Sequence, residues 1–108
     1  MSVTAQIDNP ICKDEENFNI PIMVESICRI VSPIAKRLGL DLCDNWGTFN
    51  DVGAGMTPEF FRQLDLLAAA VTEQEHTLQP HIDQRFANLK LRMTEAVERR
   101  ADVAFIIG

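Results

Sequence analysis

The sequence has no tyrosine, one tryptophan and only two histidines among its 108 residues. The absence of tyrosine removes one common general acid or base, and neither the histidines nor the three cysteines stand in a recognisable catalytic motif. No catalytic residue is assigned on this basis. We therefore expect a non-enzymatic protein rather than an enzyme.

Cysteine is equally sparse. Cys12, Cys28 and Cys43 are odd in number, widely spaced and free of any C-x-x-C pair. Neither a disulfide framework nor a zinc knuckle is indicated, and reduced thiols predict a cytoplasmic protein. Cys28 is expected to be a small core residue, whereas Cys43 lies in a predicted loop and is the thiol to test for reactivity.

Basic residues and long apolar runs are also in short supply. Ten basic residues stand against sixteen acidic ones, and the net charge of −6 argues against a nucleic-acid partner, whose phosphates attract cations. No apolar run is long enough to span a bilayer, and the first ten residues lack a basic region followed by an apolar stretch. We expect one domain with neither a membrane segment nor a signal peptide.

What the sequence does contain is a uniformly apolar stretch, LDLLAAAV, at residues 64–71. A Thr-Pro pair at 57–58 precedes it as a helix start signal, and a Gln-Pro pair at 79–80 follows it as a stop signal. These signals predict a helix over 57–78. Its apolar arc is broad, so we expect neighbours on at least two sides, with a second copy of the chain against one side near Ala69.

Two further helices are predicted around this one. Apolar residues at spacings of three and four indicate a helix over 20–38, which we expect to kink at Pro33 because proline lacks the amide hydrogen. From Ile82 onward, apolar residues alternate at four and three like a coiled-coil seam, which predicts a helix over 81–103.

The remaining segments complete an all-α prediction for a single domain, a small three-helix bundle. Residues 1–19 are interpreted as an N-terminal arm, and residues 40–56 as a long ordered loop. Val3–Ile7 alternates weakly, as a short strand would. The apolar end Val103–Ile107 favours extension of the last helix, and the alternative is a strand that pairs with Val3–Ile7 or with a second chain.

One spacing suggests a metal site. Glu73 and His76 form a Glu-x-x-His pair, which on a helix puts both side chains on one face, as the di-metal carboxylate sites of ferritin-like proteins require. Glu25, at the start of the helix over 20–38, is expected near them in an antiparallel arrangement. The alternative function is thus a dimeric ferritin-like protein holding iron or manganese, and the opposite interpretation is a solvated helix end.

Apolar side chains suggest an interaction role instead. Trp46 and Phe49 lie in the loop over 40–56, where they either plug the end of the bundle, the simpler interpretation, or face a partner. Phe105 and Ile106 are candidates for a homodimer contact, together with the last helix.

No motif matches a family closely enough to name one. We therefore expect a small cytosolic adaptor or inhibitor, an accessory protein of bacterial or phage type. It would bind a protein partner through a helical face or the Trp46 loop. A weaker alternative is a small enzyme with a pocket under the loop over 40–56.

Overall fold

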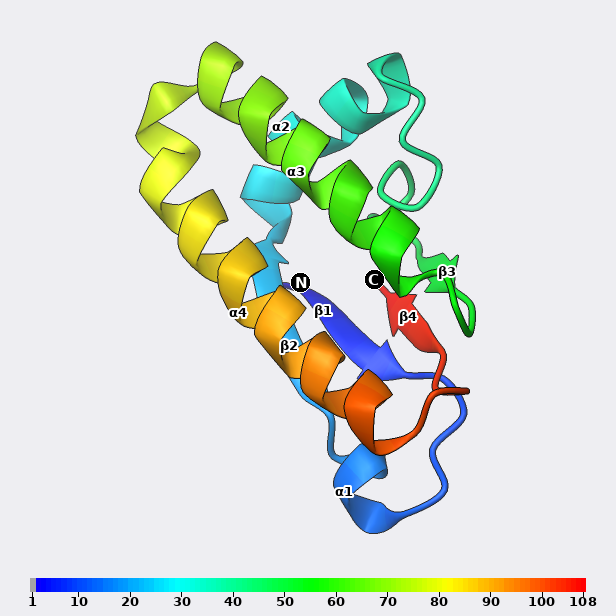
Figure 1. Ribbon diagram of the computed structural model, residues 1–108. Coiled ribbons are helices and arrows are strands. Elements are labelled where there is room, and N and C mark those ends of the chain that lie inside the picture. The colour runs from blue at the N-terminus through cyan, green and yellow to red at the C-terminus, as the bar shows by residue number, and fades with distance from the viewer. Residues whose placement is uncertain (1) are drawn as a thin grey trace.

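The computed structural model describes residues 2–108, which fold into one mixed α/β body (Figure 1). Its elements are β1 (Ser2–Ile7), α1 (Lys13–Glu16), β2 (Asn19–Val24), α2 (Glu25–Arg37), β3 (Asn50–Val52), α3 (Thr57–Gln74), the 3₁₀ helix η1 (His76–Leu78), α4 (Gln79–Arg99) and β4 (Phe105–Ile107). The strands form one antiparallel sheet in the order β2-β1-β4-β3. Helices α2 and α4 pack against this sheet, and α3 packs against α2 and α4.

The prediction of an all-α helical bundle is wrong, because segments from both ends of the chain form the sheet. The predicted arm covers residues 1–19, of which residue 1 lies outside the described part. The rest holds β1, an interior strand paired with both β2 and β4. Val3, Ala5 and Ile7 are buried and alternate with more exposed residues, as in a strand with one face on the core.

The predicted helix over 20–38 is two elements, the strand β2 and the helix α2. Ile20 and Ile22 are buried while Pro21 between them is exposed, which is the alternation of a strand. Pro21 has no amide hydrogen to donate, and β2 accommodates it because it is an edge strand. Pro33 lies inside α2, which continues through it as one helix to Arg37.

The apolar C-terminal segment is the strand β4 and does not extend α4, which ends at Arg99. The alternative prediction, a strand pairing with Val3–Ile7, is the correct one, since Ala5 faces Ile107 across β1 and β4. On its other side β4 pairs with β3. The two partners satisfy the backbone groups of a segment that carries no charge of its own.

The segment over 40–56 is less loop-like than predicted, because it contains β3 and several core side chains. The helix that follows, α3, begins at Thr57, where a start is predicted, but ends at Gln74 rather than near residue 78. Glu75 leaves the helical conformation there, with φ −138° and ψ 82°, and the short helix η1 follows.

The seam predicted on the last helix faces the core. Its side chains are buried against the rest of the chain: Ile82, Phe86, Leu89, Met93 and Ala96. In β4, Phe105 and Ile107 are equally buried, and Ile106 between them is half-buried. A dimer formed through these residues would require the core to open, so any pairing of folded chains needs another surface.

Candidate functional site

A groove runs along α2, between this helix and the segment 44–48. It consists of two adjoining hollows of about 290 and 200 Å³, which share Glu25, Cys28 and Gly47. We call it the α2 groove. Its walls are Glu25, Cys28, Arg29, Ser32, Pro33 and Lys36 on α2, Asp44, Asn45, Trp46, Gly47 and Thr48 opposite, and Ser2, Val3 and Gly108 at one end.

The helical wall is the polar face of an amphipathic helix. Groove residues recur along α2 at positions 25, 29, 32 and 36, with spacings of four, three and four that keep them on one side. The apolar residues Val31, Ile34 and Ala35 are buried in the core. Glu25 and Arg29 form an ion pair at 3.1 Å on the groove side. The same periodicity therefore builds the core and exposes the groove wall.

Asn50 holds the opposite wall in place. Its Oδ1 accepts from the backbone N–H of Asn45 at 2.8 Å, and its Nδ2 donates to the carbonyl oxygen of Asp41 and to Oδ1 of Asp44, at 3.1 and 3.2 Å. One side chain thus closes the turn of residues 41–50. The wall is a fixed surface rather than a loose loop.

Trp46 anchors this wall in the core. Its side chain is 1% exposed, its Nε1 donates to the carbonyl oxygen of Leu42 at 3.3 Å, and its ring meets Phe86 edge to face. Together with Leu40 and Cys43, Trp46 fills the space under the segment over 40–56. The apolar side chains of this segment are therefore buried in the core. The open concave surface lies beside the segment, in the α2 groove.

The side chains of the groove are suited to binding. Glu25 and Asp44 contribute negative charges and Arg29 and Lys36 positive ones, over a floor that includes Cys28. Cys28 is buried, and its sulfur lies 3.4 Å from the hydroxyl oxygen of Ser32. Neither histidine of the chain lines either hollow. The groove is therefore suited to bind a ligand whose charges and shape complement its lining.

The four predicted interaction residues do not form one surface. Trp46 and Phe105 are buried and Ile106 is half-buried in the middle of the sheet, whereas Phe49 is 46% exposed. The simpler interpretation of the aromatics, that they plug the core, holds for Trp46. Of the four predicted residues, Phe49 presents the most open side chain. It lies outside the residues that line the groove.

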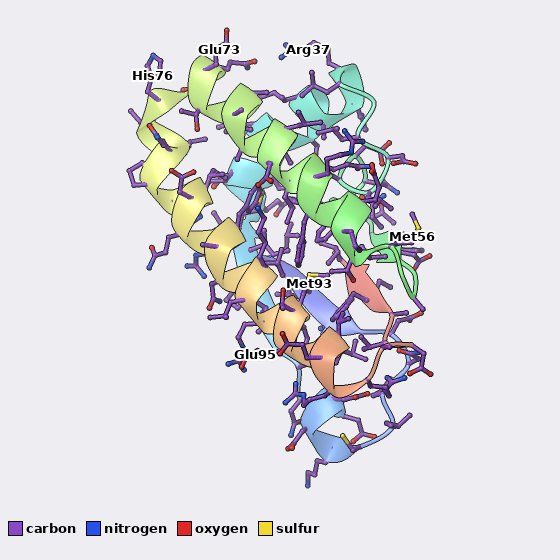
Figure 2. All side chains as sticks on the ribbon, viewed as in Figure 1. Arg37, Met56, Glu73, His76, Met93 and Glu95 are labelled. Atoms are coloured by element: carbon purple, nitrogen blue, oxygen red, sulfur yellow. The ribbon has the colours of Figure 1, made fainter. Side chains whose placement is uncertain are left out.

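The predicted metal ligands do not converge. Glu73 is on α3 and His76 on η1, with the break at Glu75 between them, so the two side chains do not share one helical face. Figure 2 shows both at the same end of the molecule as Arg37, the last residue of α2. Glu25 starts that helix, about 18 Å away at about 1.5 Å per residue. Within residues 2–108, no three His, Cys, Asp or Glu side chains form a group that could hold a metal ion.

The cysteine singled out for reactivity is inert. Cys43 is fully buried, and burial, followed by the charges of Asp44 and Asp41, raises the pKa of its thiol to about 12. The thiolate is the reactive form, so Cys43 is a core residue near neutral pH. Cys28 is also buried, as predicted, and Cys12 is exposed.

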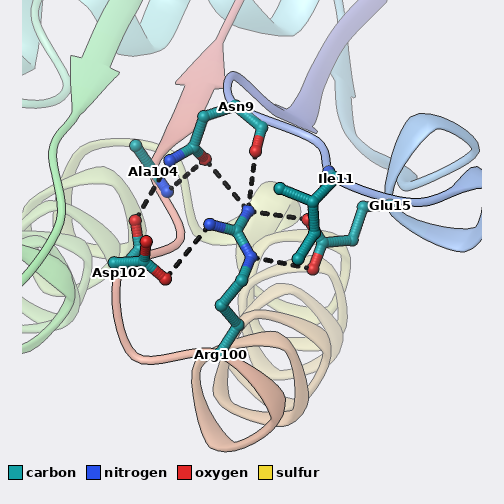
Figure 3. Close-up of polar contacts among 6 residues, drawn as sticks. All are labelled: Asn9, Ile11, Glu15, Arg100, Asp102 and Ala104. Carbon is teal, nitrogen blue, oxygen red and sulfur yellow. Dashed lines mark hydrogen bonds and ion pairs between the residues drawn. The ribbon is translucent and has the colours of Figure 1, made fainter.

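A polar cluster around Arg100 is the best-connected group of side chains outside the groove, and sequence patterns did not indicate it (Figure 3). Arg100 donates to both carboxylate oxygens of Glu15, at 2.6 and 3.1 Å, and to the carbonyl oxygen of Asn9 at 2.7 Å. The Asn9 side chain in turn donates to the carbonyl oxygen of Asp102 and accepts from the N–H of Ala104. We call this set the Arg100 clasp.

The Arg100 clasp has a structural role. It joins the connection between β1 and β2 to the connection between α4 and β4, two segments from opposite ends of the chain. The side chains of Arg100 and Glu15 are only 13% and 9% exposed and satisfy each other. The hydrogen bond from Arg100 holds the pKa of Glu15 below its ordinary value, so the carboxylate stays charged. Each nitrogen of the Arg100 guanidinium and each carboxylate oxygen of Glu15 already has a partner within the protein.

Sequence patterns did not indicate the groove residues Arg29, Ser32 and Lys36, or Asn50, which supports the opposite wall. The polar stripe of α2 was visible as the complement of its apolar stripe, but the wall opposite depends on the turn that Asn50 closes. No helix in residues 2–108 is both long and apolar enough to cross a membrane. Comparisons of the chain with protein-family models, curated protein sequences and solved structures find no match.

Proposed function

We propose that this chain is a small non-enzymatic interaction module that holds a segment of a partner protein in the α2 groove. The observation that supports this most is the pairing of a helical wall with a rigid opposite wall, which Trp46 and Asn50 keep in place. A preformed concavity loses little conformational freedom on binding, which favours affinity. Both surfaces expected to act, a helical face and the Trp46 loop, contribute to this one groove.

The groove also suggests what it recognises. Its floor is partly apolar, and its rim carries charges of both signs in the order Glu25, Arg29 and Lys36 along α2, with Asp44 across from them. A partner segment with an apolar side chain for the floor and flanking charges of both signs fits this lining. In this proposal the protein acts as an adaptor or inhibitor in the cytoplasm, through occupancy of the groove rather than chemistry.

The test is capture of the partner by tagged protein from an extract of the source cell, followed by mass spectrometry. Lys36→Glu reverses a charge on the rim, and Ser32→Trp fills the larger hollow. We expect each change to reduce capture of the same protein about tenfold or more, because Ser32→Trp occupies the hollow and Lys36→Glu repels a partner group that matches the lysine. Circular dichroism should show unchanged secondary structure for Lys36→Glu, since Lys36 is exposed, and the same measurement checks that Ser32→Trp is folded.

Arg92→Glu is the matched control, because Arg92 is an exposed cation on α4 and does not line the groove. It should leave capture unchanged. Equal loss of capture by the control and by Lys36→Glu would mean that net charge, and not the groove, governs binding. Full capture by the two groove variants would contradict the proposal.

A further inference from the structure

The outward side of α3 carries a second repeating pattern. Its inner side chains, Phe60, Leu64, Leu67 and Val71, are buried in the core. On the opposite side Arg62, Leu66, Ala69 and Glu73 are exposed, and they recur at spacings of four, three and four. Leu66 is 46% exposed, and the exposed end of α2 places a second leucine near the same side of α3. This spacing is that of a helix that packs against another helix.

The end of α2 enlarges this surface. Leu38 caps α2, is 44% exposed, and lines a shallow hollow together with Ala70 and Glu73 of α3. We call Leu38, Arg62, Leu66, Ala69, Ala70 and Glu73 the α3 face. It has apolar groups at the centre, small side chains at two positions, Arg62 at one end and Glu73 at the other, where Arg37 of α2 also lines the hollow.

We propose that two copies of the chain pair through the α3 face, with their α3 helices antiparallel about a two-fold axis. The positions 62 and 73 have the same midpoint as 66 and 69, between Leu67 and Ala68. An axis through that midpoint puts Arg62 of each copy opposite Glu73 of the other copy. It also places Leu66 of each copy against Ala69 of the other. A two-fold interface requires this kind of self-complementary surface.

The charges favour the second copy as occupant and the antiparallel direction. Arg62 donates to Glu59 through Nε and Nη2, which leaves Nη1 for another acceptor. The side chain of Glu73 makes no hydrogen bond or ion pair with residues 2–108. An antiparallel pair satisfies both groups twice, whereas a parallel pair would place Arg62 against Arg62. Like charges in contact oppose association.

The alanines allow the helices to approach closely. Ala69 and Ala70 have no side-chain atoms beyond Cβ, so the partner's Leu66 can reach the helix surface between them. The face is small compared with the interfaces of permanent dimers, which predicts a weak dimer with a Kd on the order of 10 µM. The pairing is independent of the α2 groove and requires no other protein.

Sedimentation of the purified full chain in reducing buffer, over a range of concentrations, tests the pairing. We expect the wild type to shift from monomer to dimer. Glu73→Arg should weaken the dimer about tenfold or more, because it places cations at both ends of the interface. The double change Arg62→Glu with Glu73→Arg exchanges the charges and should restore the Kd to within about threefold of the wild type.

Leu91→Ser is the control, since Leu91 is a solvent-exposed leucine of α4, outside the α3 face. It should not change the Kd. A wild type that stays monomeric at about 1 mM, far above the expected Kd, would overturn the proposal. So would an undiminished dimer in Glu73→Arg, which would locate the contact elsewhere, or a charge exchange that does not restore the dimer. None of these outcomes bears on capture of a partner by the α2 groove.

Discussion

The helical hairpin of α3 and α4 and the four-stranded sheet are built from contacts of very different range. The hairpin is one continuous stretch, and its helices meet across the short helix η1. The sheet joins β1 at one end of the chain to β4 at the other, and takes β3 from the middle. Local signals govern the first region, whereas the second forms only when distant segments meet. Substitutions at Phe105, in the Arg100 clasp and at Glu59 probe this difference, in decreasing order of effect.

Phe105→Ala should have the largest effect, because Phe105 is fully buried in β4 and its ring lies 5.6 Å from that of Phe18. Removing a buried phenylalanine side chain costs about 3–5 kcal/mol, against a total of about 5–15 kcal/mol for a typical domain. Urea unfolding followed by circular dichroism measures the loss. Leu91→Ala, at an exposed site of α4, is the control and should change the free energy of unfolding by about 0.5 kcal/mol or less. A loss at Phe105 as small as this would show that β4 contributes little to the fold.

Glu15→Gln should have an intermediate effect, because it removes the negative charge of Glu15 that pairs with Arg100 in the clasp. The folded-state pKa of Glu15 lies below its ordinary value of 4.5, mainly through the hydrogen bond from Arg100. Its contribution to stability is therefore present above that value and is lost as the pH falls through the lowered pKa. We expect the Tm of the variant to be below that of the wild type at pH 7, with the gap closing in acid.

Arg100→Lys checks the geometry of the clasp. Lysine keeps the charge but lacks the planar guanidinium that contacts both oxygens of Glu15. The Tm should again fall at pH 7. If Glu15→Gln and wild type instead unfold at the same temperature across the pH range, the clasp does not stabilise the fold.

Glu59→Gln should have the smallest effect, because Glu59 and its partners Arg62 and Gln63 are neighbours on one turn of α3 and the ion pair with Arg62 is largely exposed. The hydrogen bonds from Arg62, and then from Gln63, lower the pKa of Glu59 from 4.5 to about 2. Any stabilisation is thus present above pH 4.5 and disappears between pH 4.5 and about 2. Measured Tm values should differ little even at pH 7, since local surface pairs contribute weakly. A gap as large as that of Glu15→Gln would remove the distinction between local and distant pairs.

The hairpin shows how far local patterns reach. Thr57 and Pro58 predict the start of α3 correctly, and the apolar spacing from Ile82 correctly identifies α4 as a helix with one apolar side. What the pattern leaves open is the surface that covers this side. The apolar spacing suits contact with a second copy of the chain as well as contact with a sheet. In the structure, the chain's own core covers the apolar side of α4.

The strands show where local patterns fail. Ile20, Met23 and Ile27 have spacings of three and four that suit a helix, yet Ile20 and Met23 belong to β2 and only Ile27 to α2. Short apolar segments fit either structure until their partners are known. The segment Val103–Ile107 also suits either a helix or a strand, and its residues 105–107 form a strand because they pair with β1.

The candidate site depends on both kinds of information. The amphipathic pattern of α2 predicts its polar stripe, and the amphipathic pattern of α3 predicts its exposed stripe. The opposite wall of the α2 groove depends on hydrogen bonds from Asn50, which joins residues that no periodic pattern relates. The Glu73 and His76 pair fails for a related reason, because one residue, Glu75, interrupts the helix that the spacing requires.

The amino-acid sequence by itself determined the helices α3 and α4 and the apolar faces that each helix buries. These follow from side-chain periodicity and helix signals within a few residues of each other. Only the tertiary structure decided that both chain ends form strands of one sheet, that Trp46 is core, and that a groove lies beside α2. Strand pairing and groove walls join segments far apart in sequence, and their energies depend on which surfaces meet.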